Sequence, residues 1–150
     1  MTTRRHFLTQ LSSLGASAWW VPTDAAMAEV DPLITRSRAY AGGGQIREGK
    51  VTLEIAPLVD NGNSVPITVS VQSPMTATDR VVGIAIFNEK NPQPEVAEFT
   101  LGPRAGHAKI ATRIRLATTQ RLLAVAKMAD GSCWTHTVEV VVTLAACLED

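Results

Sequence analysis

The stretch Trp134-Thr135-His136-Thr137-Val138-Glu139-Val140-Val141-Val142-Thr143-Leu144 is the longest alternating run in the chain. Every second residue from Trp134 to Leu144 is apolar except His136, and the positions between them are mostly threonine or glutamate. Successive side chains of a β-strand point to opposite faces, so this period of two predicts a long, half-buried strand. The run therefore indicates an all-β domain that ends close to the carboxyl terminus.

Six shorter runs extend this pattern toward the amino terminus. They span residues 51–56, 65–71, 81–87, 96–101, 110–116 and 122–128. Four of them alternate or are mixed, whereas Val81–Phe87 and Leu122–Met128 are apolar on both faces. Strands of that kind lie at the centre of a sheet or are covered on their second face, for which a partner subunit is one candidate.

The breaks between these runs are rich in the residues that form turns. They are Asp60-Asn61-Gly62-Asn63, Ser73-Pro74, Asn91-Pro92-Gln93-Pro94, Gly102-Pro103, Gly106 and Asp130-Gly131. Seven short strands in about 100 residues, separated by turns of this type, favour an immunoglobulin-like antiparallel β-sandwich. A small β-barrel is the alternative architecture.

The amino terminus has the pattern of a twin-arginine export signal. Arg4-Arg5 precedes a modestly apolar stretch that runs to Val21, and Ala26-Met27-Ala28 fits cleavage between small residues. The stretch is shorter than the roughly 20 apolar residues of a spanning helix, which favours a removed signal over a membrane anchor. A basic tail without a function is the alternative. The pattern predicts export of the folded chain to a bacterial periplasm.

The remaining chain has the length of one small domain. Asp31-Pro32 can begin a short helix that continues to about Tyr40, and Gly42-Gly43-Gly44 would end it. The predicted organisation is a signal peptide at 1–28, a helical segment and linker at 29–48, a β-sandwich at 49–144 and a C-terminal arm at 145–150.

Charge and aromatic content argue against nucleic acid as a partner. The chain has 14 basic and 14 acidic residues, a formal net charge of zero and 5% aromatic residues. Two of its three tryptophans, Trp19 and Trp20, belong to the predicted signal. Neither a basic surface for a polyanion nor a stacking platform for bases is expected.

The chain has two cysteines, Cys133 and Cys147. An extended strand over 134–144 would separate them by several tens of ångströms, whereas a disulfide needs Cα atoms within about 7 Å. We therefore expect Cys133 to be a structural or partly exposed thiol at a turn, and Cys147 to be free. Because Cys147 lies near the terminus, it is either a site of covalent chemistry or an unused surface thiol or disulfide partner.

The sequence offers little for an enzyme active site. His107 and His136 are isolated, and neither has a cysteine or carboxylate at a metal-ligand spacing. The aspartates at 60, 79 and 130 lie beside turn residues, where they commonly bond their own backbone. The glycine triplet at 42–44 lacks the lysine of a phosphate-binding loop. No metal, cofactor or catalytic pair is predicted, and a carrier role fits better than catalysis.

Five further blocks of the chain are Asp60-Asn61-Gly62-Asn63-Ser64-Val65-Pro66, Ser73-Pro74-Met75-Thr76, Asn91-Pro92-Gln93-Pro94-Glu95-Val96-Ala97, Arg113-Ile114-Arg115-Leu116-Ala117 and Ala124-Val125-Ala126-Lys127-Met128-Ala129-Asp130-Gly131-Ser132. In this order and spacing, from roughly Gly49 to Thr143, the chain resembles the SoxY family, the sulfur-carrier subunits of periplasmic thiosulfate oxidation. The twin-arginine signal is also typical of that family.

The resemblance implies a non-enzymatic carrier that forms a heterodimer with SoxZ and is exported with it. In the family, a cysteine in a C-terminal Gly-Gly-Cys-Gly-Gly arm is joined oxidatively to thiosulfate by a haem-containing SoxAX partner. SoxB then hydrolyses off sulfate, and other enzymes oxidise or remove the remaining sulfur. Cys147 stands at the position of that cysteine and would hold the sulfur without a further cofactor.

The arm of this chain departs from the family pattern around Cys147. Ala145-Ala146 and Leu148-Glu149 replace the two glycine pairs, and Asp150 extends the chain by one residue. Alanine restricts the backbone more than glycine, leucine adds bulk, and the acidic residues disfavour the thiolate. A diverged binding module that retains the SoxZ-type interface is the alternative function, and a stand-alone periplasmic thiol protein is a third.

Overall fold

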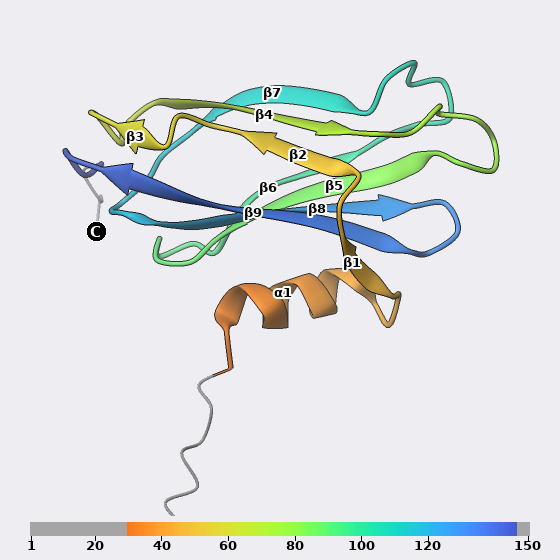
Figure 1. The fold of residues 1–150 in the computed structure, drawn as a ribbon, viewed down its shortest axis with the longest axis horizontal. Helices are drawn as coiled ribbons and strands as arrows, with labels where there is room; N and C mark the ends of the chain where they lie inside the picture. The colour runs from red at the N-terminus through yellow and green to blue at the C-terminus, as the bar shows by residue number, and fades with distance from the viewer. Residues whose placement is uncertain (1–29, 147–150) are drawn as a thin grey trace, which may run out of the picture.

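A computed structural model describes residues 30–146, and the predicted signal peptide and Cys147 lie outside the described residues. The described chain forms one helix, α1 (Pro32–Ala41), and nine strands (Figure 1). The strands are β1 (Ile46–Glu48), β2 (Val51–Glu54), β3 (Leu58–Val59), β4 (Val65–Val71), β5 (Val81–Asn88), β6 (Glu95–Thr100), β7 (Lys109–Ile114), β8 (Gln120–Met128) and β9 (Cys133–Val142).

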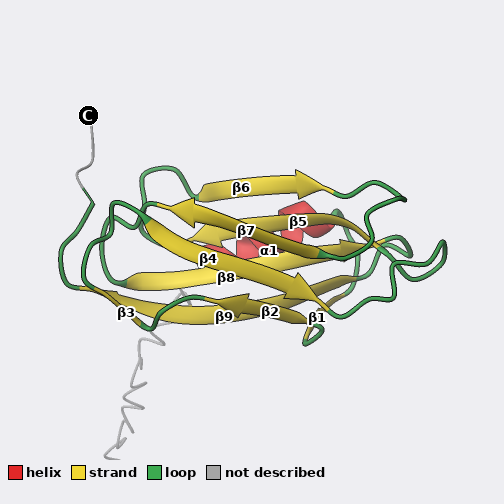
Figure 2. Ribbon diagram, turned by 90° about the horizontal axis from the view of Figure 1, so that it is seen from above, coloured by secondary structure: helices red, strands yellow, loops and turns green. Residues whose placement is uncertain are grey.

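The strands form two sheets that pack face to face, which confirms the predicted β-sandwich. One sheet has the order β1-β9-β8-β5-β6, with β3 also paired to β9, and the other has the order β2-β4-β7. Figure 1 shows the three-stranded sheet above the larger sheet, with α1 beneath, and Figure 2 views the same layers from above. Alternate residues of β4 and β9 point into the core between the sheets, among them Ile67, Val69 and Val140.

All seven predicted strands are present, and the two additional strands are β1 and β3. Both pair in parallel with β9, Ile46 beside Cys133 and Leu58 beside Val141, so the sandwich is not wholly antiparallel. Segments of three and two residues are too short to show an alternating pattern. These two segments are strands because their backbones pair with the edge of β9, and not because of a pattern in their own sequence.

The segment from β1 to β3 closes one side of the sandwich along β9. The chain pairs with β9 at β1, crosses to the other sheet at β2, and returns to β9 at β3. Between these contacts, the backbone amide of Leu53 donates a hydrogen bond to Nδ1 of His136, at 3.0 Å. An exposed strand edge can pair with other chains. In this protein, the edge of β9, the strand that leads into the C-terminal arm, is already paired with β1 and β3.

Helix α1 begins and ends where the sequence predicts. Asp31 is its N-cap, with Oδ1 accepting from the amide of Leu33 at 2.9 Å, and Pro32 occupies the first turn. Gly42 ends the helix with a left-handed φ of 61° and donates its amide to the carbonyls of Arg38 and Ala39. Glycine adopts this conformation without steric cost.

The outer face of the larger sheet is covered by α1. Leu33 and Ala41 of the helix are buried with Phe87 of β5 and Val125 of β8, and Tyr40 packs edge-on against Phe87 with ring centroids 6.1 Å apart. This second cluster explains why β5 and β8 are apolar on both faces. A partner subunit is therefore not needed to bury these two strands, because the chain supplies its own cover.

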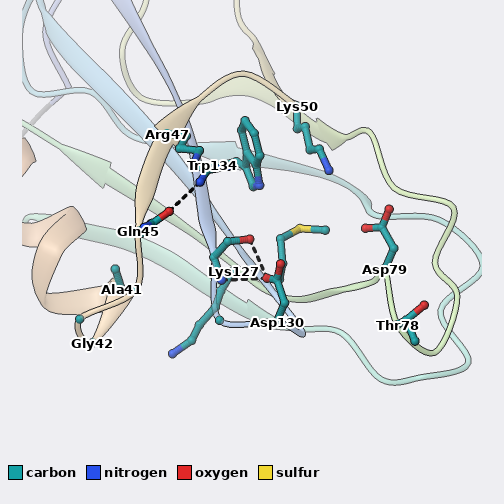
Figure 3. Close-up of a pocket in the computed structure, with 15 residues that line it drawn as sticks. Ala41, Gly42, Gln45, Arg47, Lys50, Thr78, Asp79, Lys127, Asp130 and Trp134 are labelled. Atoms are coloured by element: carbon teal, nitrogen blue, oxygen red, sulfur yellow. Dashed lines mark hydrogen bonds between the residues drawn. The ribbon is translucent and has the colours of Figure 1, made fainter.

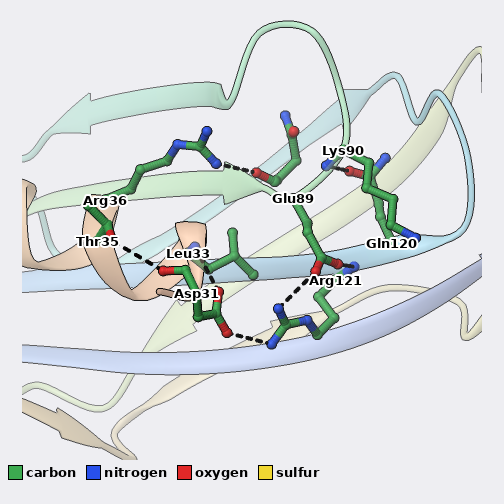
Figure 4. Close-up of polar contacts among 9 residues, drawn as sticks. Asp31, Leu33, Thr35, Arg36, Glu89, Lys90, Gln120 and Arg121 are labelled. Carbon is green, nitrogen blue, oxygen red and sulfur yellow. Dashed lines mark hydrogen bonds and ion pairs between the residues drawn. The ribbon is translucent and has the colours of Figure 1, made fainter. Parts of the chain in front are cut away.

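A three-residue ion cluster fastens the start of α1 to the sheet (Figure 4). Arg121 of β8 donates from Nη1 to Oδ2 of Asp31 and from Nη2 to Oε1 of Glu89, both at 2.8 Å. Arg36 adds a hydrogen bond to the carbonyl of Asn88, at 3.1 Å. The hydrogen bonds from Arg121 lower the pKa of both carboxyl groups below their ordinary values.

We expect acid to weaken the docking of α1. Because the folded-state pKa values of Asp31 and Glu89 are lowered, their contribution to stability is complete above about pH 4–5, the ordinary carboxyl range, and is lost as the pH falls through the lowered values. The groups are partly exposed, so each pair contributes only about 0.2–1 kcal/mol. Urea unfolding of the wild type and Arg121→Met between pH 7 and 3 measures the effect. The difference in unfolding free energy between them should shrink toward pH 3, and a constant difference would contradict this assignment.

Candidate functional site

The base of the C-terminal arm is held against the end of the sandwich by backbone hydrogen bonds. After β9, the carbonyl of Leu144 accepts from the amide of Gly62 at 2.8 Å, and the amide of Ala146 donates to the carbonyl of Leu116 at 3.1 Å. Leu116 in turn donates its amide to the carbonyl of Gly62, at 2.9 Å. Ala146 is buried. The arm is thus fixed to two separate loops immediately before Cys147.

Gly62 lies at the centre of this anchor because a larger residue does not fit there. A Cβ atom on Gly62 would overlap with the carbonyl oxygen of Leu116 and would lie 3.0 Å from the amide nitrogen of Ala146. The local pattern of residues 60–63 predicts a turn. Their contact with the arm depends on a neighbour 84 residues further along the chain, for which the local sequence contains no signal.

The amide side chains of Asn91 and Gln120 form a hydrogen-bond network with the backbone on both sides of Leu116. Oδ1 of Asn91 accepts from the amide of Ala117 at 3.0 Å and from Nε2 of Gln120 at 2.7 Å. Its Nδ2 donates to the carbonyl of Arg115 at 2.9 Å, and the buried Gln120 accepts from the amide of Lys90. Three of the blocks that carry the family resemblance, at 60–66, 91–97 and 113–117, therefore meet at the base of the arm.

Cys133 lies far from the arm and is inaccessible. It begins β9, whose ten residues span about 30 Å, and the arm follows the other end of that strand. Its side chain is fully buried in the cluster beneath α1, and this burial raises the pKa of its thiol. The structural interpretation of Cys133 is confirmed, and the alternative of a partly exposed thiol is wrong. Residue 147 lies outside the described residues, so its free thiol stays a prediction.

The other polar residues considered in the sequence have structural roles or stand alone. His136 bonds the backbone of β2, as described above, and His107 is exposed. Asp130 accepts from the amide and hydroxyl of Ser132 within its own turn, which lowers the pKa of its carboxyl group. Within residues 30–146, no group of three or more histidine, cysteine, aspartate or glutamate residues could hold a metal ion. Nor does this part of the chain contain a helix that is long and apolar enough to cross a membrane.

A groove of about 840 Å³ (Figure 3) lies beside the start of β9, at the opposite end of that strand from the arm. The ring of Trp134 forms part of its wall, with Arg47 and Lys50 at 5.8 and 5.1 Å from the ring centroid. Lys127 adds a third cation to the lining of the groove. The backbone of Lys50 has a left-handed φ of 54°. Asp79 and Asp130 offset part of this charge. The groove could hold an anionic group, but its lining residues include no thiol. No local pattern predicts it, because separate segments of the chain form it.

The chain matches one protein-family model, described as sulfur oxidation protein SoxY, over residues 37–147. Among solved structures, it is similar to the sulfur carrier protein SoxY from Chlorobium limicola f thiosulfatophilum. The two share 29% sequence identity with a TM-score of 0.63, and the match covers 75% of this chain and 96% of the other. A comparison with curated protein sequences found no significant match.

Superoxide reductases share the fold at lower identity. The superoxide reductase (neelaredoxin) from Ignicoccus hospitalis has a TM-score of 0.56 at 17% identity, over 63% of this chain and 80% of that protein. A putative superoxide reductase from Thermotoga maritima has a TM-score of 0.53 at 17% identity, over 69% and 89% of the two chains. These similarities concern the sandwich alone.

Proposed function

Because the chain belongs to the SoxY family of sulfur oxidation proteins, we propose that it is a sulfur carrier that binds its cargo covalently at Cys147. The observation that supports this most directly is the anchored arm. Ala146 is fixed to Leu116, so the backbone that leads into Cys147 starts at the rim of the sandwich. Cys133, the other thiol, is buried and unsuited to covalent exchange.

The proposed chemistry needs only a thiolate from this chain. Cys147 loses its proton, and its sulfur forms a bond with the sulfane sulfur of thiosulfate to give a cysteine S-thiosulfonate. This step releases two electrons, which a haem-containing SoxAX-like partner accepts. Water then attacks the sulfonate sulfur in a SoxB-like enzyme, which releases sulfate and leaves a persulfide on Cys147. The chain itself catalyses neither step.

The proposal includes partners and a compartment. A SoxZ-like subunit would form the heterodimer, and the predicted twin-arginine signal at 1–28 would export the folded pair to the periplasm. SoxAX-like and SoxB-like enzymes would act as transient partners. The neutral formal charge of the chain gives no reason to add nucleic acid to this set.

The composition of the arm supports one alternative function. The side chains of Glu149 and Asp150 place negative charge near Cys147, and like charge disfavours both the thiolate and an anionic adduct. A binding module that keeps the partner interface without carrying sulfur would tolerate such an arm.

Mass analysis of the C-terminal peptide from protein isolated from its native host tests the carrier function. After thiosulfate exposure, we expect sulfane and thiosulfonate adducts on Cys147 that dithiothreitol removes. The peptide that contains Cys133 is the internal control and should stay unmodified, because its thiol is buried. An unmodified Cys147 in protein that retains a bound partner would instead support the binding module.

A further inference from the structure

The indole N–H of Trp134 is a hydrogen-bond donor that has no acceptor among residues 30–146. The interactions of this side chain with charged or polar groups in that range are its contacts with Arg47 and Lys50. No buried side-chain nitrogen or oxygen of the described residues lacks a partner, so solvent reaches this N–H. In Figure 3 the indole nitrogen points into the groove. The groove therefore presents a free donor, and indole nitrogen cannot accept a hydrogen bond.

Two cations flank this donor. The guanidinium carbon of Arg47 lies 5.8 Å and the ammonium nitrogen of Lys50 lies 5.1 Å from the centroid of the Trp134 ring. Figure 3 shows these two side chains on either side of the ring. Arg47 also donates to Oε1 of Gln45, at 2.6 Å. Neither cation has a carboxylate partner within 4 Å, because both ion pairs of the described residues belong to Arg121.

The backbone at Lys50 is held in a conformation that lysine rarely adopts. Its φ of 54° lies in the left-handed region, where a Cβ atom is unfavourable. Three backbone hydrogen bonds maintain the turn: from Gly49 to Thr135 at 3.3 Å, from Val51 to Gly49 at 2.6 Å, and from Gln72 to Lys50 at 2.7 Å. Glycine or asparagine would adopt this φ with less strain. A strained lysine that faces a groove indicates a function for its side chain.

The acidic residues of the groove offset its positive charge only in part. The lining contains three cationic residues, the third being Lys127, and two acidic ones, Asp79 and Asp130. Oδ1 of Asp130 already accepts from the amide and the hydroxyl of Ser132. Neither carboxylate lies within 4 Å of a cationic nitrogen of the described residues. An anion beside Trp134 would therefore meet cations that no carboxylate neutralises directly.

We propose that the groove binds a compact tetrahedral oxoanion, such as sulfate or thiosulfate, at the indole N–H of Trp134 between Arg47 and Lys50. Such an anion presents acceptor oxygens in several directions. One oxygen accepts from the indole while the two flexible cationic side chains close on the others with charge-assisted hydrogen bonds. This inference does not rest on the proposed carrier function, because the groove contains no thiol and lies at the end of β9 remote from the arm.

Trp134 itself reports binding. The chain has three tryptophans, so the full-length double variant Trp19→Phe/Trp20→Phe retains Trp134 alone. Its fluorescence is followed during titration with sodium sulfate and with sodium thiosulfate, while sodium chloride keeps the ionic strength constant. We expect a saturable change with either oxoanion, because the indole N–H gains an acceptor.

Three further substitutions in this background separate binding from folding. Lys50→Asn should weaken sulfate binding about tenfold, yet unfold at the same or a higher urea concentration because asparagine tolerates the left-handed φ. Lys90→Asn removes the same charge at a remote loop, beside Gln120, and should bind sulfate like its parent. Asp79→Asn should tighten binding, since it removes a like charge from the groove and no hydrogen bond or ion pair of that carboxylate.

Three results would overturn the proposal. A response to sulfate no larger than the response to chloride at equal ionic strength would exclude an oxoanion site. Equal sulfate affinities of the parent and Lys50→Asn would show that this lysine does not bind the anion. Saturation by a tetraglutamate peptide without a response to sulfate would assign the groove to an acidic segment of a partner protein. Cys147→Ser should leave sulfate binding unchanged, so each result is independent of whether Cys147 carries sulfur.

Discussion

Cys147→Ser is expected to abolish thiosulfate-dependent electron transfer in a reconstituted system of the carrier, its SoxZ-like subunit, and SoxAX-like and SoxB-like enzymes. A serine hydroxyl does not form the sulfur–sulfur bond on which the proposed cycle depends, so the loss should be complete rather than graded. Thiosulfate-dependent reduction of an added electron acceptor is the measurement, followed spectroscopically.

The control for this variant is Cys133→Ala, which leaves the arm unchanged. Cys133 is buried beneath α1, so its replacement removes core contacts and lowers stability, by about 1 kcal/mol for a small core side chain. Turnover per folded molecule should be unaffected. Residual turnover in Cys147→Ser, or its loss in folded Cys133→Ala, would place the covalent chemistry elsewhere.

Gly62→Ala is expected to detach the base of the arm. The added methyl group would overlap with the carbonyl oxygen of Leu116, and neither backbone can move without breaking the hydrogen bonds among Gly62, Leu116 and Ala146. Overpacking against backbone of this kind costs about 1–3 kcal/mol of unfolding free energy. Hydrogen exchange at the amide of Ala146 should accelerate, because its bond to Leu116 is lost.

Gly106→Ala is the matched control for this substitution. A Cβ atom on Gly106 would meet no atom within 4 Å. Its effect on unfolding free energy should stay within about 0.5 kcal/mol, and exchange at Ala146 should not change. Unaltered exchange at Ala146 in Gly62→Ala would show that the arm is not held by this contact.

The two glycines illustrate what a local pattern contains and what it omits. The sequence identifies both as parts of turns, and both lie between strands. Only the packed structure distinguishes Gly62, which three chain segments surround, from Gly106, which faces open space. Turn residues encode a local backbone conformation, whereas a steric requirement for glycine arises from segments that are remote in the chain.

The sequence by itself determined the elements whose signals are local. Period-two alternation identified the strands β2, β4, β7 and β9, and continuous apolar runs identified β5 and β8. Asp31-Pro32 and Gly42 defined both ends of α1, because capping depends on residues adjacent to the helix. The five family blocks by themselves indicate the SoxY family, and the match over residues 37–147 confirms it.

Only the tertiary structure decided how these elements cover and anchor one another. It assigned the second face of β5 and β8 to α1, buried Cys133 beneath that helix, and made strands of β1 and β3 through the edge of β9. It also joined Gly62, Leu116 and Ala146 into the anchor of the arm. Each of these contacts joins residues far apart in the chain, and their energy depends on packing and hydrogen-bond geometry that exist only after the strands have paired.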